Sequence, residues 1–233
     1  MTDLYRWGGP PAGIPGFAGR IPELVGPPAS LTWTAAEASP FGLAGVDCRK
    51  HSQAAICATS EVEVAETFGR LRDDDWRPEL DPGALPASPC RLVYPDWPRR
   101  DEGFWYRATQ MEDKFDVLRR GAHVFVRSSW TGELWLVGAV RDGDGALVVE
   151  RVWGGDDGGS PESPLRARQL DFVLKSHVLG WWCPHPLPDR LLPGDPAAIG
   201  SYSFVLYGRR AYFGSFEDTT GFARSLDGRA VHE

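Results

Sequence analysis

The clearest pattern in the chain is an alternation of apolar and polar positions between residues 103 and 153. Short runs of this alternation are separated by glycine and other turn residues, which is typical of β-strands joined in hairpins. The predicted strands are 103–110, 114–120, 122–128, 133–140 and 146–153. Because the turns are short, consecutive strands are expected to pair antiparallel, and the twist of such a sheet curves it toward a barrel.

Two other segments show helical signals. Residues 60–72 begin with a capping box formed by Ser60 and Glu63, and their apolar positions share one helix face. Residues 163–179 begin with Ser163 as the predicted N-cap, a proline follows it, and a glycine comes after the last apolar position. We therefore expect at least two helices packed against the sheet.

The remaining segments lack a long period. Residues 1–45 are rich in glycine and proline and are predicted to form an irregular arm. The other expectations are an extended strand or short hairpin at 46–59, a surface loop at 73–100, a rigid extended connector at 181–188, a short helical turn opened by Asp195 and Pro196, and a final hairpin at 201–216 that turns at about Gly208. Together, the patterns predict an α+β fold with one domain at 46–233. It is built on a curved antiparallel β-sheet, formed by the meander and the C-terminal hairpin, with at least two packed helices.

The composition limits the class of protein. The formal net charge is -7 over 233 residues, whereas binding to duplex nucleic acid usually needs a concentrated basic face. We therefore expect no nucleic-acid partner. The N-terminus lacks the basic start and apolar core of a secretion signal, and no apolar run is long enough to cross a membrane, so no membrane partner is expected.

Residue usage is typical of a cytoplasmic bacterial protein. The four cysteines are irregularly spaced, which favours reduced thiols over a disulfide scaffold. Arginine outnumbers lysine 22 to 3, as in high-GC bacterial coding. Lys50, Lys114 and Lys175 are then positions at which a compact ammonium could be favoured over a planar guanidinium.

The densest mixture of charge, aromatic side chains and turn residues lies around the third predicted strand. Arg127 and Lys114 can act as charge partners of an anionic or planar ligand, and Trp130 can stack on it. Thr131 lies in the following turn, where its hydroxyl can form a local hydrogen bond. The sequence thus predicts a ligand site at these four residues. Cross-strand ion pairs between the two cations and the acidic residues 112–113 explain the same pattern without a ligand.

This stretch resembles a family of poorly characterised bacterial proteins. The likeness rests on "MEDKFDVL" and "VFVRSSWTGELWLV", which are similar to a Met-Glu-Asp-Lys-aromatic run followed by a strand and Arg-Ser-Trp-Thr-Gly, and it covers residues 104–153. In this chain Phe115 stands where a tryptophan is more usual, and an extra serine precedes Trp130. Members of the family occur alone or beside domains similar to ADP-ribosylglycohydrolases. The resemblance therefore implies a shared β-sheet unit and a link to nucleotide-derived ligands.

Three residues are candidates for acid-base catalysis, namely Glu112, His177 and Glu217. His177 falls on the apolar face of the predicted helix at its C-terminal end, where a buried histidine with one satisfied nitrogen is the alternative. Glu217 lies near the end of the last predicted strand, where a solvated acidic turn is the alternative. Asp171 and Lys175 are spaced i, i+4 and are expected to form a surface ion pair.

Motifs for metals and cofactors are weak. Cys48, His51 and Cys57 have a C-x2-H-x5-C spacing. Cys183 and His185 are further candidate ligands, but paired C-x2-C elements are missing. The chain also lacks a G-x-S-x-G elbow, a P-loop and a dinucleotide fingerprint, so we predict neither a metal nor a cofactor. His185 lies between two prolines and is expected on an exposed connector, where it could line a pocket.

These observations predict a cytoplasmic bacterial binding or interaction module that recognises a protein partner or a small anionic, nucleotide-like ligand. The first alternative is an enzyme that acts on a nucleotide or ADP-ribose-like substrate by acid-base catalysis. The second alternative is a structural assembly subunit that uses the Gly/Pro-rich arm as its contact. The sequence leaves both enzymatic activity and oligomeric state open.

Overall fold

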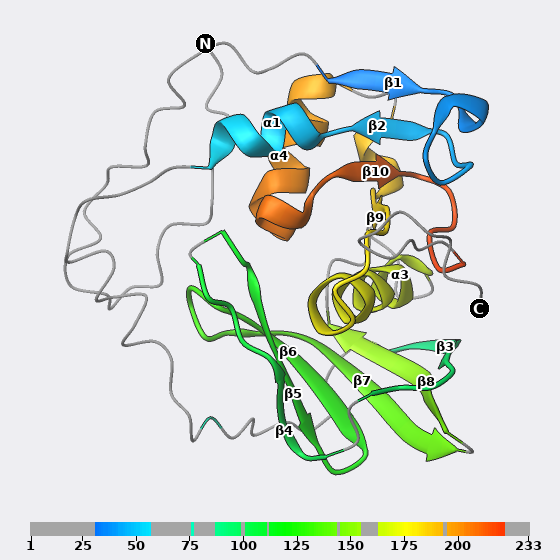
Figure 1. Ribbon diagram of the computed structural model, residues 1–233, viewed down its shortest axis with the longest axis vertical. Coiled ribbons are helices and arrows are strands. Elements are labelled where there is room, and N and C mark those ends of the chain that lie inside the picture. The colour runs from blue at the N-terminus through cyan, green and yellow to red at the C-terminus, as the bar shows by residue number, and fades with distance from the viewer. Residues whose placement is uncertain are drawn as a thin grey trace, which may run out of the picture.

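The computed structural model describes residues 31–56, 76, 87–98, 101–110, 112–143, 145–154, 163–192 and 195–221. Within these residues the chain forms two β-sheets, with a helix between them and further helices beside the smaller sheet (Figure 1). The predicted α+β fold class, with a curved antiparallel sheet and packed helices, is confirmed. The predicted helix at 60–72 and residues 1–30 of the predicted arm lie outside the described residues.

A six-stranded antiparallel sheet forms the larger layer. Its order, β3-β8-β7-β6-β5-β4, follows the chain except at β3, which pairs with β8. The strands are β3 (Ala87–Tyr94), β4 (Gly103–Tyr106), β5 (Phe115–Arg120), β6 (His123–Ser128), β7 (Leu134–Gly143) and β8 (Ala146–Gly154). The predicted meander is therefore confirmed. The loop predicted at 73–100 from its turn residues is wrong for the segment of β3, where Pro89 and the bulge between Pro89 and Leu92 are typical of an edge strand.

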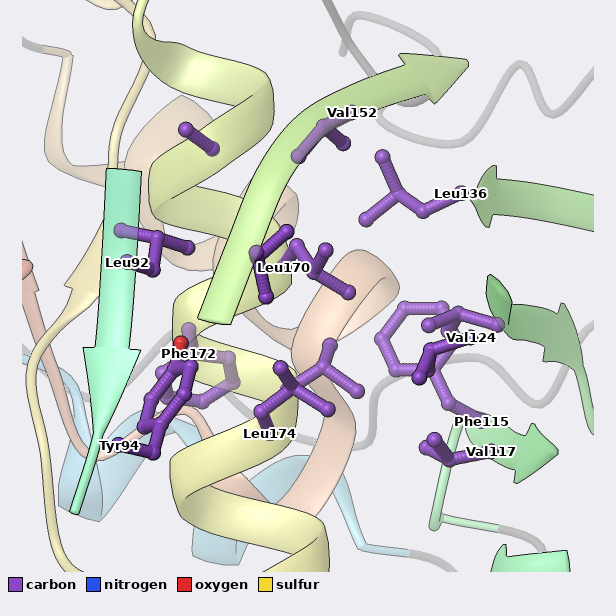
Figure 2. Packing of buried hydrophobic residues seen from close by; sticks show 14 of the residues in the cluster. Leu92, Tyr94, Phe115, Val117, Val124, Leu136, Val152, Leu170, Phe172 and Leu174 are labelled. Atoms are coloured by element: carbon purple, nitrogen blue, oxygen red, sulfur yellow. The ribbon is translucent and has the colours of Figure 1, made fainter. Parts of the chain in front are cut away.

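The central helix packs on one face of this sheet (Figure 2). α3 (Leu165–Val173) continues into the π-helical turn η3 (Leu174–Val178), so the predicted helix is confirmed. The packed side chains include Leu92, Tyr94, Phe115, Val117, Val124, Leu136, Val152, Leu170, Phe172 and Leu174. A Cβ atom at Gly138 would lie 2.6 Å from Leu170 Cδ2, so this glycine allows the helix to approach β7 closely.

The smaller sheet combines short strands from distant parts of the chain. Its order is β1 (Thr32–Thr34), β2 (Gly45–Asp47), β10 (Phe213–Ser215) and β9 (His185–Pro186). β10 pairs antiparallel with β2 and parallel with β9. α1 (Arg49–Ala55) and α4 (Pro196–Tyr207) lie beside this sheet, and α3 lies between the two sheets (Figure 1). Every residue of α3 is buried because the helix is covered from both sides.

The C-terminal segment differs from the prediction. Residues 201–216 do not form a hairpin; they complete α4, pass through the 3₁₀ turn η5 (Gly208–Arg210) and enter β10. The helix begins at the predicted position, where the Asp195 carboxylate accepts a hydrogen bond from Ala197 N at 3.0 Å. Its apolar run has neither a clear strand period nor a clear helix period, which explains the wrong assignment. Gly208 has a φ of 59° and ends the helix.

The N-terminal part also differs in detail. Residues 46–59 were predicted to be a strand or hairpin, but their described part is the end of β2 followed by α1. β1 lies inside the predicted arm and pairs with β2. Short 3₁₀ turns, η1 (Ala36–Ala38) and η4 (Asp189–Leu191), belong to the connections of the smaller sheet. Among the described residues, no helix combines the length and the apolar character needed to cross a membrane.

Candidate functional site

Arg127, a predicted ligand contact, is enclosed by the fold. Its side chain is 2% exposed, and Nε and Nη2 donate to Asp116 Oδ2 at 3.1 and 3.0 Å across β5 and β6. The ring centroids of Trp76 and Phe104 lie 4.8 and 5.4 Å from its guanidinium carbon. A cross-strand ion pair is thus present, although its carboxylate belongs to Asp116 and not to residues 112–113. The guanidinium already has the charge partner that a ligand was expected to supply.

Lys114 has different surroundings. Its Nζ lies 5.3 Å from the centroid of the Trp130 ring and 5.2 Å from that of the Phe204 ring in α4. Burial lowers the pKa of Lys114, and the Glu112 carboxylate acts in the opposite direction. No oxygen atom of the described residues forms a hydrogen bond or ion pair with this ammonium. The structure therefore brings Lys114 and Trp130 together and adds Phe204, which the sequence did not indicate.

The turn that carries Trp130 is held by its own hydrogen bonds. Ser128 Oγ accepts from the backbone N–H groups of Trp130 and Thr131, both at 3.2 Å. Thr131 Oγ1 donates to Glu133 Oε2 at 3.2 Å, so the predicted local hydrogen bond is present. Gly132 has a φ of 71°, a conformation that glycine adopts readily in turns. Thr131 therefore supports the turn that presents Trp130.

The extra serine of this turn, Ser129, joins it to the residues before β5. Its Oγ donates to Asp113 O at 2.5 Å, and its backbone N–H donates to Lys114 O at 2.9 Å. Ser129 is buried, so both bonds are shielded from water. They hold Trp130 beside Lys114.

The turn η5 reaches the same place from the C-terminal part of the chain. Arg209 N donates to Glu112 O at 3.1 Å, and Arg209 Nε donates to the buried Asp113 carboxylate at 2.8 Å. A Cβ atom at Gly208 would lie 1.9 Å from Glu112 O, so glycine is required for this close approach. Glu112, a predicted acid-base residue, therefore belongs to the surroundings of Lys114.

His177, the second acid-base candidate, lies inside the core. Its ring makes edge contacts with Tyr106 and Phe115, whose centroids lie 5.1 and 5.8 Å away. His177 Nδ1 lies 2.8 Å from Ser176 Oγ, and this hydroxyl also donates to Phe172 O. His177 Nε2 has no hydrogen-bond partner within the described residues. Burial holds the pKa of His177 well below its usual value, which matches the predicted buried histidine with one satisfied nitrogen.

Glu217, the third acid-base candidate, lies just beyond β10. Its side chain is exposed, and Oε1 accepts a hydrogen bond from Ala44 N at 3.3 Å. Its own N–H donates to Ser215 Oγ at 3.1 Å. Glu112, His177 and Glu217 thus occupy three different environments: the Lys114 surroundings, the core, and the end of the smaller sheet.

Asp171 and Lys175 form a buried ion pair, so the prediction of a surface pair is wrong. The two charged groups lie 3.2 Å apart, and their side chains are 3% and 0% exposed. Tyr94 Oη donates to Asp171 Oδ1 at 2.7 Å, and Lys175 Nζ also donates to Thr220 O. The i, i+4 spacing was interpreted correctly as a pair, but the sequence did not show that a second sheet covers this helix face.

A second buried polar cluster lies beside α4 and joins two of the candidate metal ligands, Cys48 and His185, through Ser203, which the sequence did not indicate. His185 Nε2 lies 2.8 Å from Ser203 Oγ, and Cys48 Sγ lies 3.8 Å from the same hydroxyl. His185 was predicted on an exposed connector, but it is 0% exposed because β9 lies within the smaller sheet. Burial lowers the pKa of His185 to about 3 and raises the pKa of Cys48 to about 12, so neither group is charged near neutral pH. Among the described residues, no group of His, Cys, Asp or Glu is arranged to hold a metal ion.

Two small cavities lie away from Lys114. One of about 90 Å³ lies beside β2 and is lined by the Asp47–Arg49 ion pair and three rings, those of Trp182, Tyr212 and Phe213. The other, of about 50 Å³, lies near the start of α3. Neither is lined by a predicted site residue.

No protein-family model, no curated protein and no solved structure matches the chain. The candidate site therefore rests on its own geometry: the Lys114 ammonium, the two rings beside it and the Glu112 carboxylate.

Proposed function

We propose that the protein is a binding module that recognises an anionic group of a protein partner at Lys114, with Trp130 and Phe204 as the flanking surface. The observation that carries this proposal is the state of the Lys114 ammonium. Lys114 is partly exposed, its Nζ lies within about 5.3 Å of the centroids of two aromatic rings, and it forms no hydrogen bond with a carboxylate of the described residues.

Three other cations that face the interior have an anionic partner, whereas the buried Arg168 donates to the carbonyl groups of Ser215 and Phe216. Arg127 pairs with Asp116, Lys175 pairs with Asp171, and Arg209 donates to a buried aspartate. Removing a cation from water is costly unless an anion faces it, and a ring below the cation returns only about 0.5–2 kcal/mol of that cost. An anion from another molecule would therefore bind favourably at Lys114. It would gain little at the other three cations, because their own carboxylate partners already stabilise them.

The site suits a protein partner better than a drug-sized ligand. Pockets for such ligands usually enclose about 300–1,000 Å³, and the two cavities described above, of about 90 and 50 Å³, are not lined by Lys114, Trp130 or Phe204. Lys114, Trp130 and Phe204 are each partly exposed, and a rigid turn presents the tryptophan. A partly exposed aromatic side chain beside a cation is typical of the residues that dominate protein interfaces.

Lysine-selective ¹³C NMR tests the proposal, because the chain has only three lysines. The probes are an acidic peptide with alternating glutamate and phenylalanine, ATP, and inorganic phosphate. We expect at least one anionic probe to shift the Lys114 ε-carbon signal saturably, while the signals of exposed Lys50 and ion-paired Lys175 stay in place. Lys114→Met should abolish the probe's stabilisation of the fold, and Lys50→Met should retain it. A Lys114 signal that none of the three probes moves would refute the proposal.

A further inference from the structure

We infer that the Lys114 site selects a singly charged carboxylate attached to an aromatic or aliphatic body, and that it discriminates against phosphate and phosphonate groups. This inference rests on the proposed function, because it names the chemical class that the same site takes. In a protein partner, the matching group is an acidic side chain next to an apolar residue, or a C-terminal carboxylate on an apolar residue.

The charges around the site favour a monoanion. Lys114 provides one positive charge, and the Glu112 carboxylate acts on it electrostatically. The guanidinium of Arg209, on the turn η5, already pairs through Nε with the buried Asp113 carboxylate at 2.8 Å. A dianionic phosphate would thus meet a single ammonium and a repelling carboxylate, whereas phosphate sites commonly use the planar fork of arginine or several donors. A carboxylate needs only one cation.

The backbone amides of the turn favour the same choice. Successive N–H groups of a turn can form a concave nest that binds phosphate. Here the N–H groups of Trp130 and Thr131 both donate to Ser128 Oγ, and Gly132 N donates to Ser128 O at 3.0 Å. The turn therefore satisfies its own donors and leaves Lys114 as the group that meets an anion.

The two rings favour a carboxylate that is attached to an apolar group. The Lys114 Nζ atom lies 5.3 Å from the centroid of the Trp130 ring and 5.2 Å from the centroid of the Phe204 ring. An apolar body beside the carboxylate can pack on these rings and displace water from them, which a bare inorganic anion cannot do. A monoanion also loses less hydration free energy than a dianion when it enters such surroundings.

A matched series of three compounds tests the inference: phenylacetate, phenylacetamide and benzylphosphonate, titrated at about pH 8 so that the phosphonate carries two charges. They share one benzyl group and differ in the head group. The Lys114 ε-carbon signal reports binding, with Lys50 and Lys175 as internal references. We expect phenylacetate to bind at least about tenfold more tightly than either of the other two compounds, which corresponds to about 1.4 kcal/mol. Lys114→Met should abolish the response, and Phe204→Leu should weaken phenylacetate more than acetate.

The possible failures are distinguishable. Tighter binding of benzylphosphonate that still depends on Lys114 overturns the inference and leaves the proposed binding function standing. Equal binding of phenylacetamide shows that the ammonium does not select charge, which also overturns the inference. If none of the compounds moves the Lys114 signal at about 20 mM, and the acidic peptide, ATP and phosphate fail as well, the inference and the proposed function are both wrong.

Discussion

The ammonium of Lys175 lies 3.2 Å from the Asp171 carboxylate and also donates to Thr220 O, whereas the ammonium of Lys114 lies 5.3 and 5.2 Å from the centroids of two aromatic rings. Both side chains are withdrawn from water, but the first is fully enclosed between the sheets and the second is only partly buried. A cation that the fold itself neutralises supports the architecture. A cation without an anionic partner in the described residues is a place where another molecule can complete the structure.

The largest expected effect comes from removing the carboxylate of the buried Asp171–Lys175 ion pair. Asp171→Asn leaves Lys175 buried and charged without its carboxylate, so the free energy of unfolding should fall by about 3–5 kcal/mol. Tyr94 donates to the same carboxylate at 2.7 Å, which adds to the loss. Urea-induced unfolding, followed by tryptophan fluorescence, measures the change.

Lys114→Met is the matched control for that experiment. Methionine can pack against the same two rings without a charge, so the free energy of unfolding should change by less than about 1 kcal/mol. A comparable loss of unfolding free energy in both variants would show that Lys114 supports the fold as much as the Asp171–Lys175 pair does. The contrast between the two lysines would then be wrong.

The same division between local and distant contacts explains what the sequence could predict. The meander was predictable because its strands follow one another and are joined by short turns. The proximity of Lys114 and Trp130 follows from the β5–β6 hairpin alone. The carboxylate partner of Arg127 did not follow, because it depends on the exact pairing of residue 116 with residue 127, which alternation does not specify.

The smaller sheet, and the position of Phe204 beside Lys114, depend on segments far apart in sequence. β9 has two residues and β1, β2 and β10 have three each, too few to show an alternation. Phe204 reaches Lys114 only because the segment around it is a helix and not the predicted hairpin. Likewise, the prolines beside His185 suggested exposure, whereas the parallel pairing of β9 with β10 buries it.

Acid should lower the free energy of unfolding, because the fold buries His185 as a neutral side chain with its pKa lowered to about 3. An imidazole of the unfolded chain takes up protons below about pH 6.5, so over this range the unfolded state binds more protons than the folded state. Stability that is present above pH 6.5 is therefore lost as the pH falls. For His185 the loss between about pH 6.5 and pH 5 is about 2 kcal/mol.

Urea unfolding at a series of pH values, with wild type and His185→Gln, measures this contribution. The variant should show a shallower dependence on pH, while His177, whose pKa is also lowered by burial, continues to contribute. An identical slope in both proteins would mean that His185 is not neutral in the folded state over this range.

A smaller effect is expected at the turn beside Lys114. Ser129→Ala removes the hydroxyl that donates to Asp113 O, so the free energy of unfolding should fall by about 1 kcal/mol. Because this bond fixes Trp130 beside Lys114, the Lys114 response to phenylacetate should also weaken. Ser163→Ala removes a hydroxyl at the start of α3 and should leave that response unchanged. Equal responses in both variants would show that Ser129 does not position the tryptophan.

The smallest expected effect concerns Glu112, whose carboxylate acts on Lys114 without pairing with it. Glu112 raises the pKa of Lys114 against the effect of burial, so Glu112→Gln should lower this pKa in an NMR titration of the ε-carbon signal. The same change removes a repelling charge, and at a pH below the Lys114 midpoint the affinity for phenylacetate should rise about two- to fivefold, or about 0.4–1 kcal/mol. Glu133→Gln removes a carboxylate that accepts a hydrogen bond from Thr131, and it should leave the pKa of Lys114 in place. If both variants behave alike, Glu112 does not set the charge of the site, and the preference for a monoanion must come from the two rings and the single ammonium.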